Sequence, residues 1–222
     1  MFLIGDIGNT EVKIILFNKK KKILKRFFLK TDKINDSYVS KKLKLTKKFA
    51  ARIDIILFSS VVPSIFFKIK DFFTKKFKKK CFELKDLKLN KVIKIKVNKN
   101  QIGSDRLANS LAVINEGKNF IIVDFGTATT FDVVVKDVYL GGVIAPGVDL
   151  SLKTLSSKAK LIPQISLSKN SKVIGKNTVS AVRSGFYWGY AGLIDNIIKL
   201  ISKQSKKSYK IIFTGGYSSL FK

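Results

Sequence analysis

Two turns that follow apolar strands carry the residue types that handle phosphate. In each turn an apolar run ends in Asp, any residue and Gly, and a β-rich run follows: FLIGDIGNTEVKIILF at 2–17 and FIIVDFGTATTFDVVV at 120–135. Glycine lets backbone N–H groups approach phosphate oxygens, and a carboxylate at a strand end can hold a cation or its water shell. The turns offer these polar residues: Asp6, Asn9, Thr10 and Lys13 in the first, and Asp124, Thr127, Thr129 and Thr130 in the second.

The two turns repeat one design. Asp6 and Asp124 are 118 residues apart, and Gly8 and Gly126 have the same separation. One such turn is also compatible with an ordinary hairpin that contains an Asx turn. Two turns in the same strand context favour a duplicated fold, and we expect both to serve one nucleotide triphosphate. We place a domain boundary near residue 117, with an N-terminal half at 1–117 and a C-terminal half at 118–222.

A third group of candidate functional residues is Gly103-Ser104-Asp105-Arg106, at the predicted start of a helix. Free N–H groups and the helix dipole favour anions at such a position. The presence of Asp105 at this position can also be explained without a catalytic role, as a residue that caps the helix. Arg106 is harder to explain in this way, because arginine is rare in this chain and its planar fork binds carboxylate and phosphate in a bidentate manner.

The elements that position these groups follow from hydrophobic periodicity. Leu107, Leu111 and Ile114 have helical spacing, with Ser104 as a candidate N-cap and Gly117 as a candidate stop. Pro63 suits the first turn of a helix. Strands are predicted at 2–7, 12–17, 23–29, 53–60, 91–97 (near an edge), 120–135 (as a hairpin), 137–144 and 209–214. Helices are predicted at 36–50, 63–79, from 104 to about 117, shortly after Pro146-Gly147, and at 178–203.

The last predicted helix carries small residues on one face. Ala181, Gly185 and Gly189 are four residues apart, and each glycine costs about 1 kcal/mol relative to Ala in a helix interior. Tolerance of both suggests that another backbone lies close to this face. Packing within the domain, a subunit contact and the wall of a substrate pocket all remain open.

Composition excludes several kinds of chemistry. The chain contains no histidine, so Ser-His-Asp and Cys-His catalysis and imidazole zinc sites are impossible within it. The single cysteine, Cys81, cannot form an intramolecular disulfide and suits a reducing compartment. No apolar run is long enough to span a membrane, and the N-terminus lacks the basic leader of a secretory signal. We therefore expect a cytoplasmic protein.

The formal charge of +29 invites a nucleic-acid interpretation. Nearly all of the 44 basic residues are lysines, and they occur in almost every segment. This distribution is more typical of a residue preference across a whole proteome than of a selected binding surface. We therefore expect no specific nucleic-acid partner, although the positive field would attract anionic substrates.

Five motifs in series resemble type III pantothenate kinase, a family of the acetate and sugar kinase, heat-shock chaperone and actin superfamily. They are DIGNTEVK at 6–13, GSDRLAN at 103–109, VDFGTATTFD at 123–132, GGVIAPG at 141–147 and IGKNT at 174–178. The resemblance implies an α/β fold: a duplicated ribonuclease-H-like (actin-like) two-domain architecture with mixed five-stranded sheets flanked by helices. It also implies ATP-dependent phosphorylation of pantothenate to 4′-phosphopantothenate, the first step of coenzyme A biosynthesis.

The resemblance also implies roles for individual residues. Asp105 would be the catalytic base that accepts the proton of the substrate hydroxyl, and Asp124 would bind a monovalent cation, K⁺ or NH₄⁺. Mg²⁺ would accompany ATP, and the protein would be a homodimer whose site is completed near the subunit contact. ATP would be bound by Asp6, Gly8, Asn9, Thr10, Lys13, Thr127 and Gly215, and pantothenate by Gly103, Ser104, Asp105, Arg106 and Thr178. Members of the family continue beyond the TGG turn at 214–216, so we expect the C-terminal half to lack its usual final segment.

Two alternatives share parts of this pattern. Another small-molecule phosphotransferase of the same fold would keep the two acidic turns but have a different acceptor pocket. A catalytically inactive nucleic-acid-binding or regulatory relative would explain the basic charge, but it would have no reason to keep Asp105 and Arg106 together.

Overall fold

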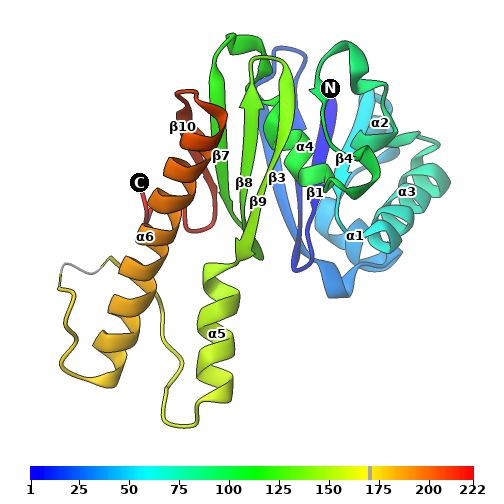
Figure 1. Cartoon of the computed structure of the whole chain (residues 1–222). Coiled ribbons are helices and arrows are strands. Elements are labelled where there is room, and N and C mark those ends of the chain that lie inside the picture. Colours follow the sequence, from blue (N-terminus) through cyan, green and yellow to red (C-terminus); the bar gives the residue numbers. More distant parts are fainter. Residues whose placement is uncertain (170–171) are drawn as a thin grey trace. The chain divides into compact units, whose positions relative to one another are not determined.

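The computed structural model describes residues 1–169 and 172–222. The chain forms two compact units, the first made of Met1–Val92 with Asn98–Leu111 and the second of Ile93–Val97 with Ala112–Lys222. Each unit contains one five-stranded sheet with associated helices (Figure 1). Both sheets mix parallel and antiparallel pairs, which confirms the predicted architecture.

The sheet of the first unit has the order β3-β2-β1-β4-β5. Strands β1 to β3 form an antiparallel meander, and β4 and β5 run parallel to β1. Alternation in β2 places Val12, Ile14 and Leu16 in the core, because successive side chains of a strand point to opposite faces. The strands are β1 (Phe2–Ile7), β2 (Glu11–Phe17), β3 (Ile23–Lys30), β4 (Ile55–Ser60) and β5 (Cys81–Glu83).

Four α-helices accompany this sheet in the described part of the chain: α1 (Asp36–Leu43), α2 (Lys47–Ala51), α3 (Pro63–Phe77) and α4 (Ser104–Leu111). The single helix predicted at 36–50 is divided, because Lys44 adopts a left-handed conformation and Thr46 caps a new helix. Helix α3 begins at Pro63 as predicted. It buries Phe66, Ile69 and Phe73 in the core of the unit.

The start of α4 differs from the prediction. Ser104 is the first residue of the helix and not its N-cap, so the proposed capping role is wrong. The helix also ends at Leu111, six residues before Gly117. Gly117 instead follows a short 3-10 turn, Ile114–Glu116, with a φ of 63°. Leu107 is buried and anchors the helix, as its periodicity predicted.

The sheet of the second unit has the order β10-β7-β8-β9-β6. Strands β7, β8 and β9 form an antiparallel meander, and β10 runs parallel to β7. The strand predicted at 91–97 is shorter than expected: only Lys94 and Ile95 pair, parallel to β9, at the edge of the sheet. The strands are β6 (Lys94–Ile95), β7 (Asn119–Phe125), β8 (Ala128–Val135), β9 (Val138–Pro146) and β10 (Lys210–Gly215).

Two helices complete the second unit, α5 (Val148–Lys158) and α6 (Thr178–Ser205). One face of the sheet packs against them through a core that includes Phe125, Phe131, Val148 and Ile194. Neither helix, nor any other in the part of the chain that the structure describes, has the length and apolar character to cross a membrane.

The part of the small-residue face of α6 that carries Gly185 and Gly189 is open within the described chain. A Cβ added at Gly185 or Gly189 would meet no atom within 4 Å. Both glycines and Ala181 are exposed. Packing within the domain therefore does not explain Gly185 and Gly189, and the interpretation of these two as a helix–helix contact inside the domain is wrong. Ala181 differs, because the backbone at Gly175 lies against it.

Candidate functional site

The first acidic turn joins β1 to β2. Asp6 lies directly opposite Lys13 in the antiparallel register, so the two side chains share one face of the sheet. The N–H of Gly8 donates to the carbonyl of Glu11 at 3.0 Å. The Thr31 hydroxyl donates to the Gly8 carbonyl at 2.9 Å, which ties the turn to the segment after β3.

Three polar side chains of this turn face solvent: Asp6, Asn9 and Thr10. The hydroxyl of Ser59, on the neighbouring strand β4, donates to Asp6 Oδ1 at 2.6 Å. This bond fixes the orientation of the carboxylate, because β1 and β4 pair at these two residues. The turn therefore presents an oriented carboxylate, two exposed polar side chains and a lysine.

The second predicted group lies at the start of α4. Asp105 and Arg106 are half-buried, and Asp105 Oδ1 accepts the N–H of Arg106 at 2.8 Å. A Cβ at Gly103 would lie 2.3 Å from the same oxygen, so a side chain there would displace the Asp105 carboxylate. Ser104 is fully buried, and its Oγ has no hydrogen-bond partner among the described residues.

Both groups of the first unit border one strand. Helix α4 packs against β4 and against the 3-10 turn Leu84–Asp86. Strand β4 is also the parallel neighbour of β1, which carries Asp6 at its end. The fold thus gathers the acidic turn and the Gly103–Arg106 group around β4, although about 100 residues separate them in the sequence.

The second acidic turn joins β7 to β8. Asp124 lies opposite Thr130 of β8 on one side and Thr214 of β10 on the other. Residues that are directly paired in adjacent strands point to the same face. The register therefore places three oxygen-bearing side chains in a row, with the carboxylate in the centre.

Glycines bring three segments of the second unit together at this turn. A Cβ at Gly147 would lie only 2.0 Å from the carbonyl oxygen of Thr127, so the start of α5 lies directly on the β7–β8 turn. Gly215 has a φ of +84°, and a Cβ there would lie 2.5 Å from Asp124 Oδ1. The N–H of Gly216 donates to the Phe125 carbonyl at 3.0 Å. Asp124, Thr127 and Gly215, to which the family resemblance assigns cation and nucleotide binding, are therefore neighbours.

Thr178 is not part of this cluster. It is the first residue of α6, directly after the N-cap Asn177, whose side chain accepts the N–H of Ser180. The part of α6 that packs on the sheet includes Ile194, which lies 16 residues further along the helix. Tyr190, whose hydroxyl donates to the Pro146 carbonyl at the end of β9, lies closer to Thr178 along the helix. At 1.5 Å per residue, Thr178 is about 18 Å from Tyr190, so it lies away from the β7–β8 turn of its own unit.

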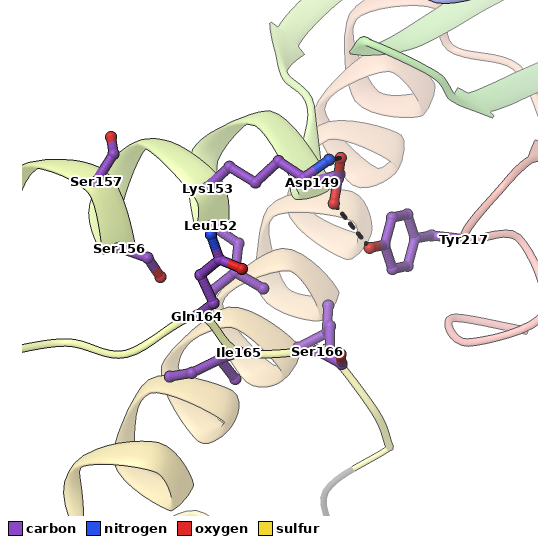
Figure 2. Close-up of a pocket in the computed structure, with 10 residues that line it drawn as sticks. Asp149, Leu152, Lys153, Ser156, Ser157, Gln164, Ile165, Ser166 and Tyr217 are labelled. Atoms are coloured by element: carbon purple, nitrogen blue, oxygen red, sulfur yellow. Dashed lines mark hydrogen bonds and ion pairs between the residues drawn. The ribbon is translucent and has the colours of Figure 1, made fainter.

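A cavity of about 650 Å³ lies beside α5 (Figure 2). Asp149 is at its rim, paired with Lys153 at 2.7 Å, and the Tyr217 hydroxyl donates to Asp149 Oδ1 at 3.3 Å. Burial and the negative charge of Asp149 raise the pKa of Tyr217, and the hydrogen bond to Asp149 raises the pKa of Lys153. Sequence reasoning missed Asp149 and Tyr217. Their positions in the sequence could have indicated them, because Asp149 closely follows the Pro146-Gly147 turn and Tyr217 directly follows Gly215-Gly216.

A second carboxylate of the β8 strand was also missed. Asp132 is fully buried and accepts a hydrogen bond from the Tyr139 hydroxyl at 2.9 Å. Asp132 and Asp124 point to the same face, because Asp132 pairs with Ile122, two residues before Asp124. Asp132 is the last residue of the motif VDFGTATTFD. This residue was therefore part of a recognised motif, but no role was assigned to it from the sequence.

The donors at Asp124 suit a cation held largely by oxygen atoms. In the described part of the chain, no group of three or more Asp, Glu or Cys side chains is placed to hold a metal ion. A cation at Asp124 would therefore take its other ligands from hydroxyl, carbonyl or phosphate oxygens, which Thr130 and Thr214 can supply in part. This arrangement fits a weakly held monovalent ion and a Mg²⁺ ion that arrives with a nucleotide.

Sequence comparisons agree on one family. A family model described as type III pantothenate kinase matches residues 2–200. A type III pantothenate kinase of Pelagibacter ubique is 60% identical over 222 residues, which cover 100% of this chain and 90% of that relative. A type III pantothenate kinase of Cereibacter sphaeroides is 37% identical over 229 residues, which cover 100% of this chain and 88% of that relative. The resemblance seen in the five motifs is confirmed.

Solved structures share the fold. A protein from Campylobacter jejuni, described as a conserved putative Baf family transcriptional activator, is 21% identical with a TM-score of 0.57, covering 99% of this chain and 85% of that one. A putative N-acetylglucosamine kinase from Porphyromonas gingivalis has a TM-score of 0.51 at 14% identity, covering 100% and 89%. The activator of 2-hydroxyisocaproyl-CoA dehydratase from Clostridium difficile, with bound ADPNP, has a TM-score of 0.51 at 9% identity, covering 99% and 81%. These similarities support the predicted actin-like fold.

Proposed function

The chain belongs to the type III pantothenate kinase family, and on this basis we propose that it transfers the γ-phosphoryl group of ATP to the hydroxyl of pantothenate with Asp105 as the base. The product is 4′-phosphopantothenate, the first intermediate on the route to coenzyme A. We place this reaction in the cytoplasm, where ATP is supplied. The family match supports this activity most directly, because it spans 2–200 and includes every acidic motif discussed above.

Asp105 is positioned to accept the proton of the acceptor hydroxyl. Its Oδ1 accepts the backbone N–H of Arg106 at 2.8 Å, which fixes the orientation of the carboxylate. Phosphoryl transfer passes through a loose transition state, so orientation of the hydroxyl matters more than the strength of the base. Arg106 binds the pantothenate carboxylate in this proposal, and the buried Ser104 hydroxyl and the Gly103 backbone complete the acceptor site.

The two acidic turns bind ATP in this proposal. Backbone N–H groups of Asn9 and Thr10 and the Lys13 side chain would neutralise charge on the phosphates, and Asp6 would orient the Mg²⁺ that accompanies ATP. In the second unit, Thr127 and Gly215 contact the nucleotide. The start of α5 adjoins this turn, because a Cβ added at Gly147 would lie 2.0 Å from the Thr127 carbonyl oxygen.

Asp124 binds a monovalent cation, K⁺ or NH₄⁺, in this proposal. The row formed by Thr214, Asp124 and Thr130 supplies one charge and two hydroxyl oxygens. When bound, the ion would offset negative charge on the transferring phosphoryl group. The chain's own contribution is to hold the carboxylate in register at the end of β7.

Thr178 contacts pantothenate from the second half of the chain in this proposal, and the protein is a homodimer whose site is completed near the subunit contact. One observation supports a homodimer: the face of α6 that carries Gly185 and Gly189 is uncovered in the part of the chain that the structure describes. Small residues on an exposed helix face permit the close approach of another helix.

The test is ADP production with pantothenate as the acceptor, in K⁺ and in Na⁺ buffers. We expect activity that requires pantothenate and is higher in K⁺. Asp105→Asn keeps the size of the side chain but removes the base, so the expected loss of kcat is about 10²- to 10⁴-fold. Asp71→Asn is the matched control, because Asp71 is an exposed acid of the same unit, paired with Lys75 at 3.6 Å.

The proposal fails if purified protein releases ADP no faster with pantothenate than with other small alcohols. It also fails if Asp105→Asn and Asp71→Asn have equal kcat values. Either result would favour another phosphotransferase of the same fold or a protein that has lost catalysis.

A further inference from the structure

Thr31 holds the first acidic turn from the segment that follows β3. The Thr31 side chain is 5% exposed, and its hydroxyl donates to the Gly8 carbonyl at 2.9 Å. The backbone N–H of Thr31 donates to the Thr10 carbonyl at 3.1 Å. One buried residue therefore bonds to the carbonyls on both sides of Asn9, which is exposed in the turn.

The two bonds differ in what they require of the sequence. The N–H bond continues the backbone pairing of β2 with β3, in which Glu11 lies opposite Lys30, and any residue except proline could make it. The hydroxyl bond depends on the side chain and reaches the Gly8 carbonyl, which lies between the end of β1 and the start of β2. Sheet pairing therefore explains the N–H bond, and the hydroxyl bond needs a separate explanation.

The hydroxyl bond sets the direction of the next backbone N–H. A trans peptide group is planar, so its C=O and N–H bonds point in opposite directions. Gly8 and Asn9 share a trans peptide group. Because the Gly8 carbonyl is directed at the buried Thr31 hydroxyl, the Asn9 N–H is directed away from Thr31, toward the exposed side of the turn. Without the hydroxyl this peptide plane could rotate, and it would then present its carbonyl oxygen to an anion.

Gly8 cannot supply the phosphate donor of this turn, because its own N–H donates to the Glu11 carbonyl at 3.0 Å. We propose that Thr31 is a positioning residue for nucleotide binding: its hydroxyl fixes the Gly8–Asn9 peptide plane so that the Asn9 N–H donates to a phosphate oxygen of ATP. This inference rests on the proposed function, because it takes the first acidic turn to bind phosphate. Thr31 acts through the turn and does not touch the nucleotide.

The test measures dissociation constants for ATP and inorganic triphosphate by calorimetry, in a high-salt buffer that screens the diffuse positive charge. Thr31→Val keeps the shape of the side chain and removes the hydroxyl. A hydrogen bond to a charged group corresponds to about a ten- to hundredfold change in affinity, so Thr31→Val should weaken the binding of both probes by that factor. The KM for pantothenate at saturating ATP should not change. Thr31→Ser keeps the hydroxyl and should bind both probes as the wild type does.

Thr74→Val is the matched control. The Thr74 hydroxyl also donates to a main-chain carbonyl of the first unit, that of Lys79 at 3.4 Å, and its removal should leave all of these values unchanged. A second measurement needs no variant to fold. In NMR spectra of isotopically labelled wild-type protein, the amide proton of Asn9 should move downfield when inorganic triphosphate is added. The amide proton of Tyr38, which donates to Asn35 Oδ1, should not move.

An Asn9 resonance that triphosphate leaves in place overturns the inference. A Thr31→Val protein that binds triphosphate as tightly as the wild type also overturns it, and so does one whose KM for pantothenate rises by the same factor, because that result indicates a purely structural role. The proposed function is tested separately. Pantothenate phosphorylation with no effect of Thr31→Val on triphosphate binding refutes only the role of Thr31. Weakened triphosphate binding in Thr31→Val without pantothenate phosphorylation by the wild type refutes only the acceptor.

Discussion

Gly147 offers the sharpest structural test of the second acidic turn. Its backbone has φ −74° and ψ 145°, a conformation that alanine adopts without strain. Glycine is therefore required at this position only because there is no room for a side chain. A Cβ would lie 2.0 Å from the Thr127 carbonyl oxygen, 2.6 Å from its carbon and 2.9 Å from the Gly126 oxygen.

The substitution Gly147→Ala therefore forces the backbone of α5 or of the β7–β8 turn to move. Real Cβ contacts essentially never fall under 3.0 Å, so α5 or the turn has to shift by about 1 Å. No side-chain rotation can relieve this contact, because the opposing atoms belong to the main chain. Overpacking of this kind costs about 1–3 kcal/mol. The smaller entropy of the unfolded alanine chain offsets about 0.4–1 kcal/mol of that cost.

The assay is urea unfolding followed by circular dichroism, combined with the KM for ATP. We expect Gly147→Ala to lower the free energy of unfolding by about 0.5–2 kcal/mol after that offset and to raise the KM for ATP, since the shifted turn carries Thr127. Gly189→Ala is the matched control. It lies in the interior of α6 with nothing within 4 Å, so it should stabilise a monomer by about 1 kcal/mol.

A Gly147→Ala protein with wild-type stability and wild-type KM would refute the close approach of α5 to the turn. It would also remove the main support for placing phosphate there. If Gly189→Ala destabilised the protein instead, the α6 face would be covered in solution, as the homodimer proposal requires.

Two further predictions concern buried groups. Burial raises the pKa of the Cys81 thiol to about 12, from an ordinary value of 9.0. Because the folded pKa is the higher one, the contribution to stability is complete below pH 9 and is lost as the pH rises. The free energy of unfolding should therefore fall by about 1.4 kcal/mol per pH unit between about pH 9 and 11 relative to Cys81→Ala; parallel pH curves for the two proteins would contradict this. Tyr139→Phe removes the donor to buried Asp132 and should cost about 1–3 kcal/mol in urea unfolding. Tyr38→Phe, which removes a partly exposed hydroxyl, should lower the free energy of unfolding by less than Tyr139→Phe. Equal losses for the two variants would show that the buried Tyr139–Asp132 hydrogen bond contributes no more than an exposed one.

Most elements were predictable from local pattern. The strands at 2–7, 12–17 and 23–29 have the expected places, because alternation of apolar and polar residues depends only on neighbouring residues. The start of α3 at Pro63 followed from the fixed φ of proline. One error occurred where non-local pairing decides: in the strand predicted at 91–97, only Lys94 and Ile95 pair with β9. Another was local, because Lys44 and Thr46 divide the helix predicted at 36–50.

The candidate site was only partly predictable. Asp6, Asp124 and the Gly103–Arg106 group were visible as motifs, because glycine and acid types at strand ends are informative in themselves. The capping role of Ser104 was wrong, since the helix begins one residue earlier than the pattern indicated and buries the hydroxyl. No sequence signal showed that Ser59 orients Asp6 or that Tyr139 donates to Asp132.

The sequence alone determined the family, the duplicated acidic turns and the residue types available for phosphoryl transfer, because these depend on residue identity and spacing along the chain. The tertiary structure decided which of these residues are neighbours. Gly147 lies on Thr127, Gly215 lies on Asp124, and Tyr217 reaches Asp149 across 68 residues. Such contacts depend on strand order and helix packing, and hydrophobic periodicity contains no information about either.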